Sequence, residues 1–361
     1  MKTIKMRCVD WWEQDTKENF YKNPFIQALS QKYNIEYSNK PDFLLYGPFG
    51  QNNLQFPKEV VRIFYTGENT RTDWNIADYG IDFDFMDFGD RHLCMPLFFL
   101  PGECGISSRA ITKHLRAEQI FQEKREKFCA FLVSNGSNHI RNTAFKKLCA
   151  YKKVDSGGRY LNNIGGRIGD RFKDFEKSKY EWLLGYKFNL CFENSSYPGY
   201  VTEKILQAYE AGCIPIYWGD STLCDVRYAK YRPTFNPKAF VNAHDFANLD
   251  ELVQEVRRID NDNEAYLAML KEPIFLDSTI DTHVLGGGGK HKLNNLQLFS
   301  NFITPFFTHI FESQNPKRIY FIPENQDKFV QYKNMIHMAR TYKHIKKYIP
   351  KPLRKYVGFG V

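Results

Sequence analysis

The stretch Lys187–Gly219, KFNLCFENSSYPGYVTEKILQAYEAGCIPIYWG, decides the fold of this chain. Apolar residues alternate with polar or small ones up to Glu193, which is typical of a β-strand that ends in a loop. From Val201 the apolar residues recur at helical spacing, and Gly212 then ends the segment as a C-terminal helix glycine does. A short apolar strand follows at 214–218. The stretch therefore predicts a βαβ unit and, with it, a parallel sheet.

Glu203 and Lys204 lie at the predicted start of the helix, beyond the carboxyl end of the preceding strand. Open α/β sheets bind their ligands at that edge. Free backbone N–H groups and a lysine suit the phosphates of a nucleotide, and a carboxylate can accept hydrogen bonds from ribose hydroxyls. On spacing alone, such a pair is more often a solvated helix surface.

Three sequence blocks, in this order and at these intervals, resemble the signature of the α-1,3-fucosyltransferases of glycosyltransferase family 10. The blocks are Cys191-Phe-Glu-Asn-Ser, Gly199-Tyr-Val-Thr-Glu-Lys-Ile and Ile214-Pro-Ile-Tyr-Trp-Gly. A fourth string, Phe64-Tyr-Thr-Gly-Glu-Asn69, extends the resemblance to the N-terminal half. The absence of an apolar N-terminal anchor favours a bacterial relative over the animal enzymes.

The resemblance implies an α/β fold of the GT-B type, in which two Rossmann-like domains face each other across a cleft. We expect an acceptor-binding domain at 1–125, a GDP-fucose-binding domain at 126–327 and a basic amphipathic helix at 328–361. The strongly charged segment 123–127 marks the expected junction. An apolar helix at 295–311 is expected to complete the second domain.

The resemblance also implies a reaction: transfer of L-fucose from GDP-β-L-fucose, with inversion, to a hydroxyl of N-acetylglucosamine. We expect O3 of N-acetyllactosamine-type glycans as the acceptor, in a Lewis-type antigen on lipopolysaccharide. An α-1,4 or dual α-1,3/4 fucosyltransferase, a GT-B transferase using another nucleotide sugar, and an inactive glycan-binding protein remain alternatives. No cofactor is implied, and a divalent metal is not expected to be essential. The regiochemistry, the acceptor length and the oligomeric state stay open.

Glu68 is the predicted catalytic base. It follows a glycine at the carboxyl end of the apolar strand 60–65. Fucosyl transfer needs a group that removes the acceptor hydroxyl proton, and a partly buried carboxylate with a raised pKa can do so near neutral pH. From the residues alone, a glutamate that only accepts bonds within its own turn is the more ordinary interpretation. In the family, the glutamate of the matching string is the proposed base.

The predicted donor-binding residues surround the βαβ unit and a glycine-rich segment that precedes it. They are Arg159, Arg167, Tyr200, Glu203, Lys204, Asn194 and Asn242. Glycine pairs interleaved with arginines suit a diphosphate cradle, although a mobile linker has the same composition. The spacing does not choose between the two arginines, and we rank Arg159 first because it follows a strand directly. Arg141 is left open between a phosphate contact and plain surface.

Trp11 and Trp12 follow the predicted strand 4–9, and we expect one to lie in the core and the other to stack on the acceptor sugar. Asp82 and Asp84 form an Asp-x-Asp pattern, which another class of glycosyltransferase uses to hold a divalent metal. The pattern is weak in a segment rich in Asp and Phe. We therefore interpret it as an acceptor-side loop or surface.

The composition limits the number of domains, the location of the protein and the state of its cysteines. A chain of 361 residues with 43% hydrophobic content is long enough for about two domains. The sequence contains no signal-peptide core and no apolar run of about 20 residues, so we expect a cytoplasmic protein. The eight cysteines include no C-x-x-C pair, and we interpret them as reduced core residues.

The positive charge of the chain is confined to its C-terminal end. Lys and Arg total 50 against 41 acidic residues, and the segment 328–361 holds nine of the basic residues and no acidic one. The remainder is therefore formally neutral, which argues against a nucleic-acid partner. Apolar residues in the segment step by three and four: Met335, Met338, Tyr342, Ile345 and Ile349. This pattern favours peripheral binding to an anionic membrane over a two-stranded coiled coil.

Overall fold

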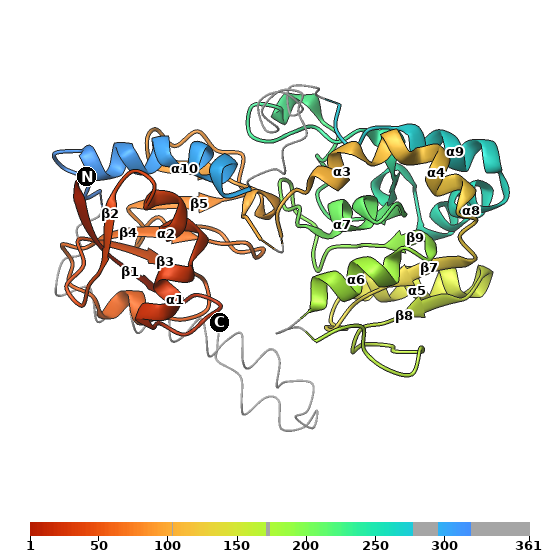
Figure 1. The fold of residues 1–361 in the computed structure, drawn as a ribbon, viewed down its shortest axis with the longest axis horizontal. Coiled ribbons are helices and arrows are strands. Elements are labelled where there is room, and N and C mark those ends of the chain that lie inside the picture. The colour runs from red at the N-terminus through yellow and green to blue at the C-terminus, as the bar shows by residue number, and fades with distance from the viewer. Residues whose placement is uncertain (103, 171–173, 277–294, 319–361) are drawn as a thin grey trace, which may run out of the picture.

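The computed structural model of the chain describes residues 1–102, 104–170, 174–276 and 295–318. Figure 1 shows two lobes side by side, each built around its own sheet. Every strand pair in both sheets is parallel. The α/β class that the sequence predicts is therefore confirmed. The predicted C-terminal helix within 328–361 lies outside the described residues.

The first lobe contains a six-stranded sheet with the order β2-β1-β3-β4-β5-β6. Its strands are β1 (Thr3–Val9), β2 (Asn34–Tyr37), β3 (Phe43–Tyr46), β4 (Val61–Tyr65), β5 (Tyr79–Asp82) and β6 (His92–Cys94). All residues of β3, β4 and β5 are buried, as expected for central strands of a parallel sheet that is covered on both faces. Two short helices, α1 (Lys17–Lys22) and α2 (Pro24–Leu29), connect β1 to β2.

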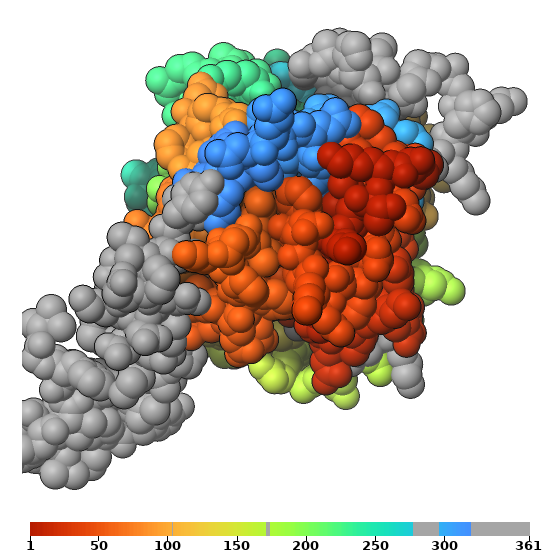
Figure 2. Space-filling model, turned by 90° about the vertical axis from the view of Figure 1, so that its left-hand side faces the viewer, coloured from red at the N-terminus to blue at the C-terminus, as the bar shows by residue number. Residues whose placement is uncertain are grey.

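Helix α10 (Asn295–Glu312) returns from the far end of the chain to cover the first sheet. Its buried residues Phe299, Ile303 and Phe307 recur every four positions and join the core that contains β1, β3 and β4. Figure 2 shows this helix in blue, lying on the red and orange first lobe. The prediction that this helix completes the second domain is wrong, because its apolar face packs against α2 and the first sheet.

A segment of the N-terminal part of the chain packs on the second lobe. Helices α3 (Ser108–Thr112) and α4 (Ala117–Gln122) precede the expected junction, but they pack on the second lobe. Ile111 joins a core cluster with residues of α7, and Ile120 joins the core of the second sheet. The lobes therefore exchange segments on both sides of the boundary expected near residue 125.

The second lobe contains a five-stranded sheet with the order β11-β10-β9-β7-β8. Its strands are β7 (Lys127–Phe131), β8 (Val154–Ser156), β9 (Tyr186–Leu190), β10 (Ile214–Tyr217) and β11 (Val241–Asn242). Its helices are α5 (His139–Tyr151), α6 (Phe175–Leu183), α7 (Lys204–Glu210), α8 (Leu249–Asn261) and α9 (Asn263–Lys271). The predicted βαβ unit is confirmed as β9-α7-β10. Strand order reverses between β7 and β9, and open α/β sheets bind ligands at such a reversal.

Two further sequence predictions concern the whole chain. All eight cysteines lie in the described residues, which contain no disulfide; five are buried in the core, whereas Cys104, Cys149 and Cys224 are partly exposed. Each helix in the described part of the chain is too short or too polar to span a lipid bilayer.

Candidate active site

The turn that carries Glu68 lies where the two lobes meet. β4 ends at Tyr65, and the Thr66 hydroxyl then accepts a hydrogen bond from the Glu68 backbone N–H at 2.9 Å and donates one to the Glu68 carbonyl at 3.1 Å. The next residue, Asn69, donates from Nδ2 to Ser195 Oγ of the second lobe at 2.6 Å. These bonds fix the turn and direct it toward the loop that follows β9.

Glu68 is partly buried among charged groups of the second lobe. Burial raises the pKa of its carboxyl above the ordinary value, and nearby Glu203 and Glu193 act in the same direction. Lys204 and a hydrogen bond with Asn194 oppose this effect without cancelling it. A carboxylate with a raised pKa in this position is a better proton acceptor than an exposed one.

Glu193 is the residue that organises the loop after β9, and the sequence analysis gave it no role. Its side chain is completely buried, and its two oxygens accept hydrogen bonds from the Thr202 backbone N–H and hydroxyl at 2.8–2.9 Å. It also forms an ion pair with Lys204, Oε2 to Nζ, at 2.6 Å. Glu193 stands inside one of the matching sequence blocks, so its position there was the available signal.

Lys204 and Glu203 begin helix α7, close to their predicted place. Glu203 is the N-cap residue and Lys204 the first helical residue. Burial alone would lower the pKa of Lys204, but Glu193 and Glu203 outweigh it and raise that pKa. Burial likewise would raise the pKa of Glu203, yet Lys204 and Lys179 lower it overall. Both side chains are therefore charged near neutral pH.

Tyr200 and Asn194 also belong to this cluster. Tyr200 is buried, and its ring lies 5.1 Å from that of Phe83, which comes from the first lobe. Burial and the charge of Glu193 raise the pKa of its hydroxyl, so Tyr200 stays neutral. The structure thus brings together Glu68, Asn194, Tyr200, Glu203 and Lys204, five of the residues that the sequence predicted.

Arg159 and Arg167 line one cavity of about 740 Å³ together with Glu203 and Ser134. The cavity lies at the carboxyl ends of β7 and β8. A Cβ on Gly158 would lie 2.1 Å from the Val133 carbonyl oxygen, so only glycine lets this loop approach β7 so closely. Gly157 and Gly158 and both arginines line this cavity, whereas Gly165 and Gly166 are not among its lining residues.

The other predicted contacts have different surroundings. Asn242 is not among the residues that line this cavity; its side chain accepts from the His244 backbone N–H and donates to Asp245. Arg141 is buried and donates a hydrogen bond to the Asn135 carbonyl. Its positive charge interacts with the carboxylate of Glu193. It is therefore not plain surface.

The two tryptophans differ as the sequence analysis expected. Trp11 stacks on Tyr65 with 5.1 Å between ring centroids and packs against the first core. Trp12 is 41% exposed, and its ring lies 5.6 Å from that of Phe49, which is also exposed. Trp12 and Phe49 form an aromatic surface near the carboxyl ends of β1 and β3.

Both carboxylates of the Asp-x-Asp pattern are bound by side chains of the first lobe. Asp82 is completely buried, accepts from the Thr72 hydroxyl and lies 2.8 Å from His92 Nε2. Asp84 forms an ion pair with Arg71 at 2.7 Å. The interpretation of this segment as surface is therefore wrong for Asp82, whose carboxylate is used inside the first lobe.

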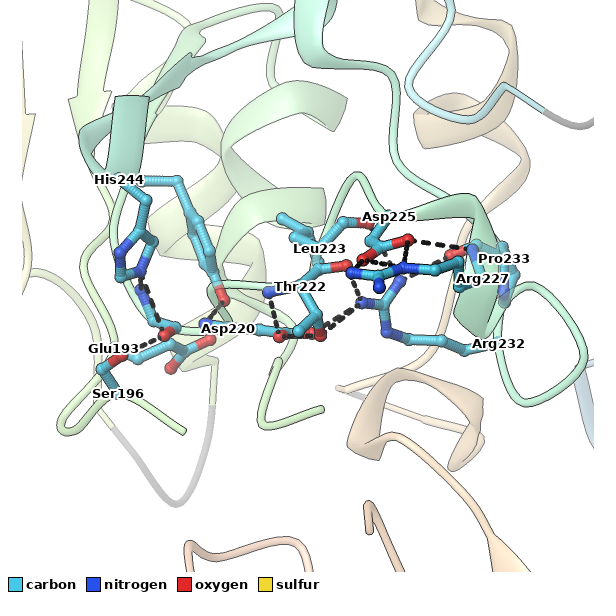
Figure 3. Close-up of polar contacts among 12 residues, drawn as sticks. Glu193, Ser196, Asp220, Thr222, Leu223, Asp225, Arg227, Arg232, Pro233 and His244 are labelled. Carbon is cyan, nitrogen blue, oxygen red and sulfur yellow. Dashed lines mark hydrogen bonds and ion pairs between the residues drawn. The ribbon is translucent and has the colours of Figure 1, made fainter. Parts of the chain in front are cut away.

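A buried ion pair fixes the loop that follows β10 (Figure 3). Asp220 and Arg232 lie 2.7 Å apart, and neither side chain is exposed by more than 1%. Arg232 also donates to the carbonyl oxygens of Leu223 and Pro233. Because breaking a buried pair leaves an uncompensated charge, this contact holds the loop in one conformation.

Comparisons with known proteins place both lobes in one family. Residues 6–100 match the description "Alpha-(1,3)-fucosyltransferase FucT N-terminal domain", and residues 122–271 match "Glycosyltransferase family 10 (fucosyltransferase) C-term". The "Alpha-(1,3)-fucosyltransferase FucT" of Helicobacter pylori is 33% identical over 301 residues, which are 74% of this chain and 60% of that protein. The human "4-galactosyl-N-acetylglucosaminide 3-alpha-L-fucosyltransferase FUT6" is 33% identical over 144 residues, 39% of this chain and 36% of its own length. The chain thus spans less than two thirds of the length of each of these relatives.

Solved structures match a larger share of this chain than these relatives do. A crystal structure of an alpha1,3-fucosyltransferase with GDP-fucose is 31% identical, has a TM-score of 0.63, and is matched over 89% of this chain and 94% of that one. A second, with GDP, is 32% identical with the same TM-score, over 88% and 92%. The GT-B arrangement expected from the sequence is confirmed by these matches. The chain therefore belongs to glycosyltransferase family 10, the fucosyltransferases.

Proposed function

We propose that this chain is an inverting α-1,3-fucosyltransferase that moves L-fucose from GDP-β-L-fucose to O3 of N-acetylglucosamine in N-acetyllactosamine-type glycans. The observation that carries the proposal is the position of Glu68, which faces Lys204 and Asn194 across the junction of the lobes with a raised pKa. The similarity to fucosyltransferase structures with GDP-fucose and with GDP supports GDP-fucose as the donor.

In this proposal Glu68 is the general base. Its carboxylate removes the proton of the acceptor hydroxyl while that oxygen forms a bond to the anomeric carbon of fucose. The bond from this carbon to the phosphate oxygen breaks, and its electron pair leaves with GDP. Attack from the face opposite GDP inverts the anomeric carbon, so a β-linked donor gives an α-linked product.

The departing diphosphate is stabilised by positive side chains of the second lobe. Arg159, Arg167 and Glu203 line the 740 Å³ cavity, and Lys204 follows Glu203 at the start of α7. Arginine can bind two phosphate oxygens at once, and fixed charges stabilise a leaving anion without reorganisation. Asn194, Tyr200 and Glu203 would orient the sugar and the ribose.

The charge of the diphosphate is met by these cations, and we propose that no divalent metal is essential. The carboxylates of the Asp-x-Asp pattern are occupied by Thr72, His92 and Arg71, so a metal would have to displace those contacts.

The acceptor would stack on the aromatic surface of Trp12 and Phe49. Sugar C–H faces suit the negative face of an aromatic ring, and both rings are exposed. A Lewis-type antigen on lipopolysaccharide is the acceptor we favour. The basic segment 328–361 would hold the enzyme on the inner, anionic face of a membrane.

Labelled GDP-fucose supplied with N-acetyllactosamine, with and without chelator, tests the proposal. We expect a fucosylated product linked α-1,3, formed at the same rate in both conditions. Linkage at O4 would indicate an α-1,4 or dual enzyme, and turnover only with another nucleotide sugar would indicate a different GT-B transferase. Glycan binding without turnover of any donor would leave a glycan-binding protein.

A further inference from the structure

A series of hydrogen bonds crosses between the lobes next to Glu68. Asn69 Nδ2 donates to Ser195 Oγ at 2.6 Å, and Ser195 Oγ donates to Asn194 Oδ1 at 3.3 Å. The Asn194 side chain in turn forms a hydrogen bond with Glu68. The series therefore leaves the first lobe beside the proposed base, passes through the loop after β9 and returns to that base.

Arg71 stands at the start of this series. Its Nη1 donates to Asn69 Oδ1 at 3.1 Å. Its Nε forms an ion pair with Asp84 at 2.7 Å, and its guanidinium carbon lies 3.5 Å from the centroid of the Tyr197 ring in the second lobe. A cation over an aromatic face is attracted by the ring. Because contacts from both lobes hold the guanidinium, it is a fixed donor.

The direction of every bond follows from the arginine. A guanidinium has donors only, so the Asn69 amide must present its oxygen to Arg71 and its Nδ2 to Ser195. The Ser195 hydroxyl then accepts from Asn69, and its single hydrogen is left for Asn194 Oδ1. With its oxygen bound in this way, the Asn194 amide presents Nδ2 to Glu68. Arg71, Asn69, Ser195 and Asn194 thus form one hydrogen-bond relay.

The orientation of the last amide matters because its two ends act oppositely on a carboxylate. Donation from Nδ2 favours the ionised form of Glu68, whereas an amide oxygen would disfavour it. Asn194 is exposed, so its amide could rotate if nothing held it. We propose that the relay positions the catalytic base by holding Asn194 Nδ2 toward the Glu68 carboxylate, and that it is complete only while the two lobes are in contact. This inference rests on the proposed role of Glu68.

The bond from Asn194 can be separated from the other groups around the base. Five titratable side chains interact electrostatically with Glu68: Tyr65, Glu193, Tyr200, Glu203 and Lys204. Within the described residues, none of these five is bonded to Asn69 or Ser195. Burial raises the pKa of Glu68, and the bond from Asn194 opposes that rise. Loss of the relay therefore raises this pKa further, while the five groups keep their places.

The pH dependence of kcat/KM for N-acetyllactosamine tests the proposal, because its acidic limb reports the ionisation of the base in the free enzyme. Ser195→Ala removes the hydroxyl in the middle of the relay. Arg71→Lys keeps the positive charge but loses the planar fork that reaches several partners at once. We expect each variant to move the acidic limb to higher pH by about one unit, the shift expected for loss of a hydrogen bond to a charged group. The loss of activity should therefore be larger at low pH than on the plateau.

Ser196→Ala is the matched control, because this neighbouring hydroxyl donates to the Gly219 carbonyl at 2.5 Å and lies outside the relay. Its acidic limb should coincide with that of the wild type. Circular dichroism checks the fold of each variant, and either relay variant alone decides the question if the other does not fold.

Activity lost equally at every pH in Ser195→Ala and Arg71→Lys, with the acidic limb in place, would overturn the proposal, because the contact would then only hold the lobes together. An equal shift of the limb in Ser196→Ala would overturn it as well. Both outcomes differ from a failure of the proposed function, which would show as fucosyl transfer retained by Glu68→Gln.

Discussion

Lys113 is buried without a compensating carboxylate, which makes the stability of the second lobe depend on pH. The residue begins the 3₁₀ turn Lys113–Arg116 and is 0% exposed. Its Nζ donates to the Leu270 carbonyl at 3.1 Å and lies 4.0 Å from the centroid of the Tyr209 ring. Among the described residues no carboxylate pairs with it. Burial, and secondarily the charge of Arg125, lower the pKa of Lys113 to about 7.

The sign of the effect follows from proton binding. In the unfolded chain this lysine has its ordinary pKa of 10.5, so between pH 7 and 10.5 the unfolded state binds one more proton than the folded state. The free energy of unfolding therefore rises with pH by about 1.4 kcal/mol per unit over this window. From pH 7.5 to 9.5 the contribution of Lys113 is about 2–3 kcal/mol. Below pH 7 the folded state carries the full cost of the buried charge.

The variant Lys113→Met isolates this contribution, because methionine keeps most of the side-chain volume and does not titrate. Urea unfolding of both proteins at pH 7.5, 8.5 and 9.5 gives the difference in unfolding free energy at each pH. We expect the wild type to gain about 2–3 kcal/mol on the variant across the series. Lys146→Met, which replaces an exposed lysine of α5, should show no such change. Parallel pH curves for wild type and Lys113→Met would refute the reasoning.

Four further predictions concern the reaction and the tail. Glu68→Gln should reduce transfer by about 100-fold or more and leave GDP affinity in calorimetry nearly unchanged, because the carboxylate acts only on the acceptor proton; weakened GDP binding would contradict that role. Lys204→Ala should weaken GDP more than GMP, and equal affinities for both nucleotides before and after the change would remove its phosphate contact. Arg159→Ala and Arg167→Ala should each weaken GDP about 10-fold or more, and an arginine whose loss leaves GDP affinity intact is not a ligand. A chain ending after Asn325 should keep fucosyl transfer but no longer sediment with anionic vesicles at low salt; equal sedimentation of both forms would exclude the membrane contact.

The local elements could be predicted because their signals are local. The βαβ unit was evident from the periodicity of its apolar residues and from Gly212, which has a φ of +78° and ends α7 as a glycine in left-handed conformation. Helices α8 and α9 begin directly after Asn248 and Asp262, whose side chains cap them. Capping and periodicity involve neighbours in sequence, so one chain displays them directly.

The destination of α10 could not be predicted in the same way. Its apolar residues show that it is buried, but both sheets offer an apolar face that a helix can cover. The choice depends on contacts with residues almost 300 positions away, such as the hydrogen bond from Ser300 Oγ to the Ala28 carbonyl at 3.1 Å. An ion pair adds to these distant contacts, because Lys317 Nζ lies 2.6 Å from Asp78 Oδ2 in the first lobe.

The site was recognised through its sequence blocks, whereas its electrostatics depends on burial that the sequence does not show. Glu193 reads as the polar end of a strand, yet it is completely buried and bound to Lys204. Two of the three Nζ donors of Lys204 are used by Glu193 and Thr202. At most one remains for a phosphate oxygen unless these bonds rearrange.

This arrangement shifts the balance of charge from the lysine to the arginines. Glu68, Glu193 and Glu203 face the cations Lys204, Lys179 and Arg141, so this cluster has no excess positive charge with which to attract a diphosphate. Attraction must come from further cations. Arg159 and Arg167 line the cavity together with Asp170, Glu176 and Glu203, and within the described residues neither arginine is held in an ion pair. Lys204 then serves mainly to hold Glu193 in place and to lower the pKa of Glu203, and we expect the arginines to supply most of the attraction for the donor.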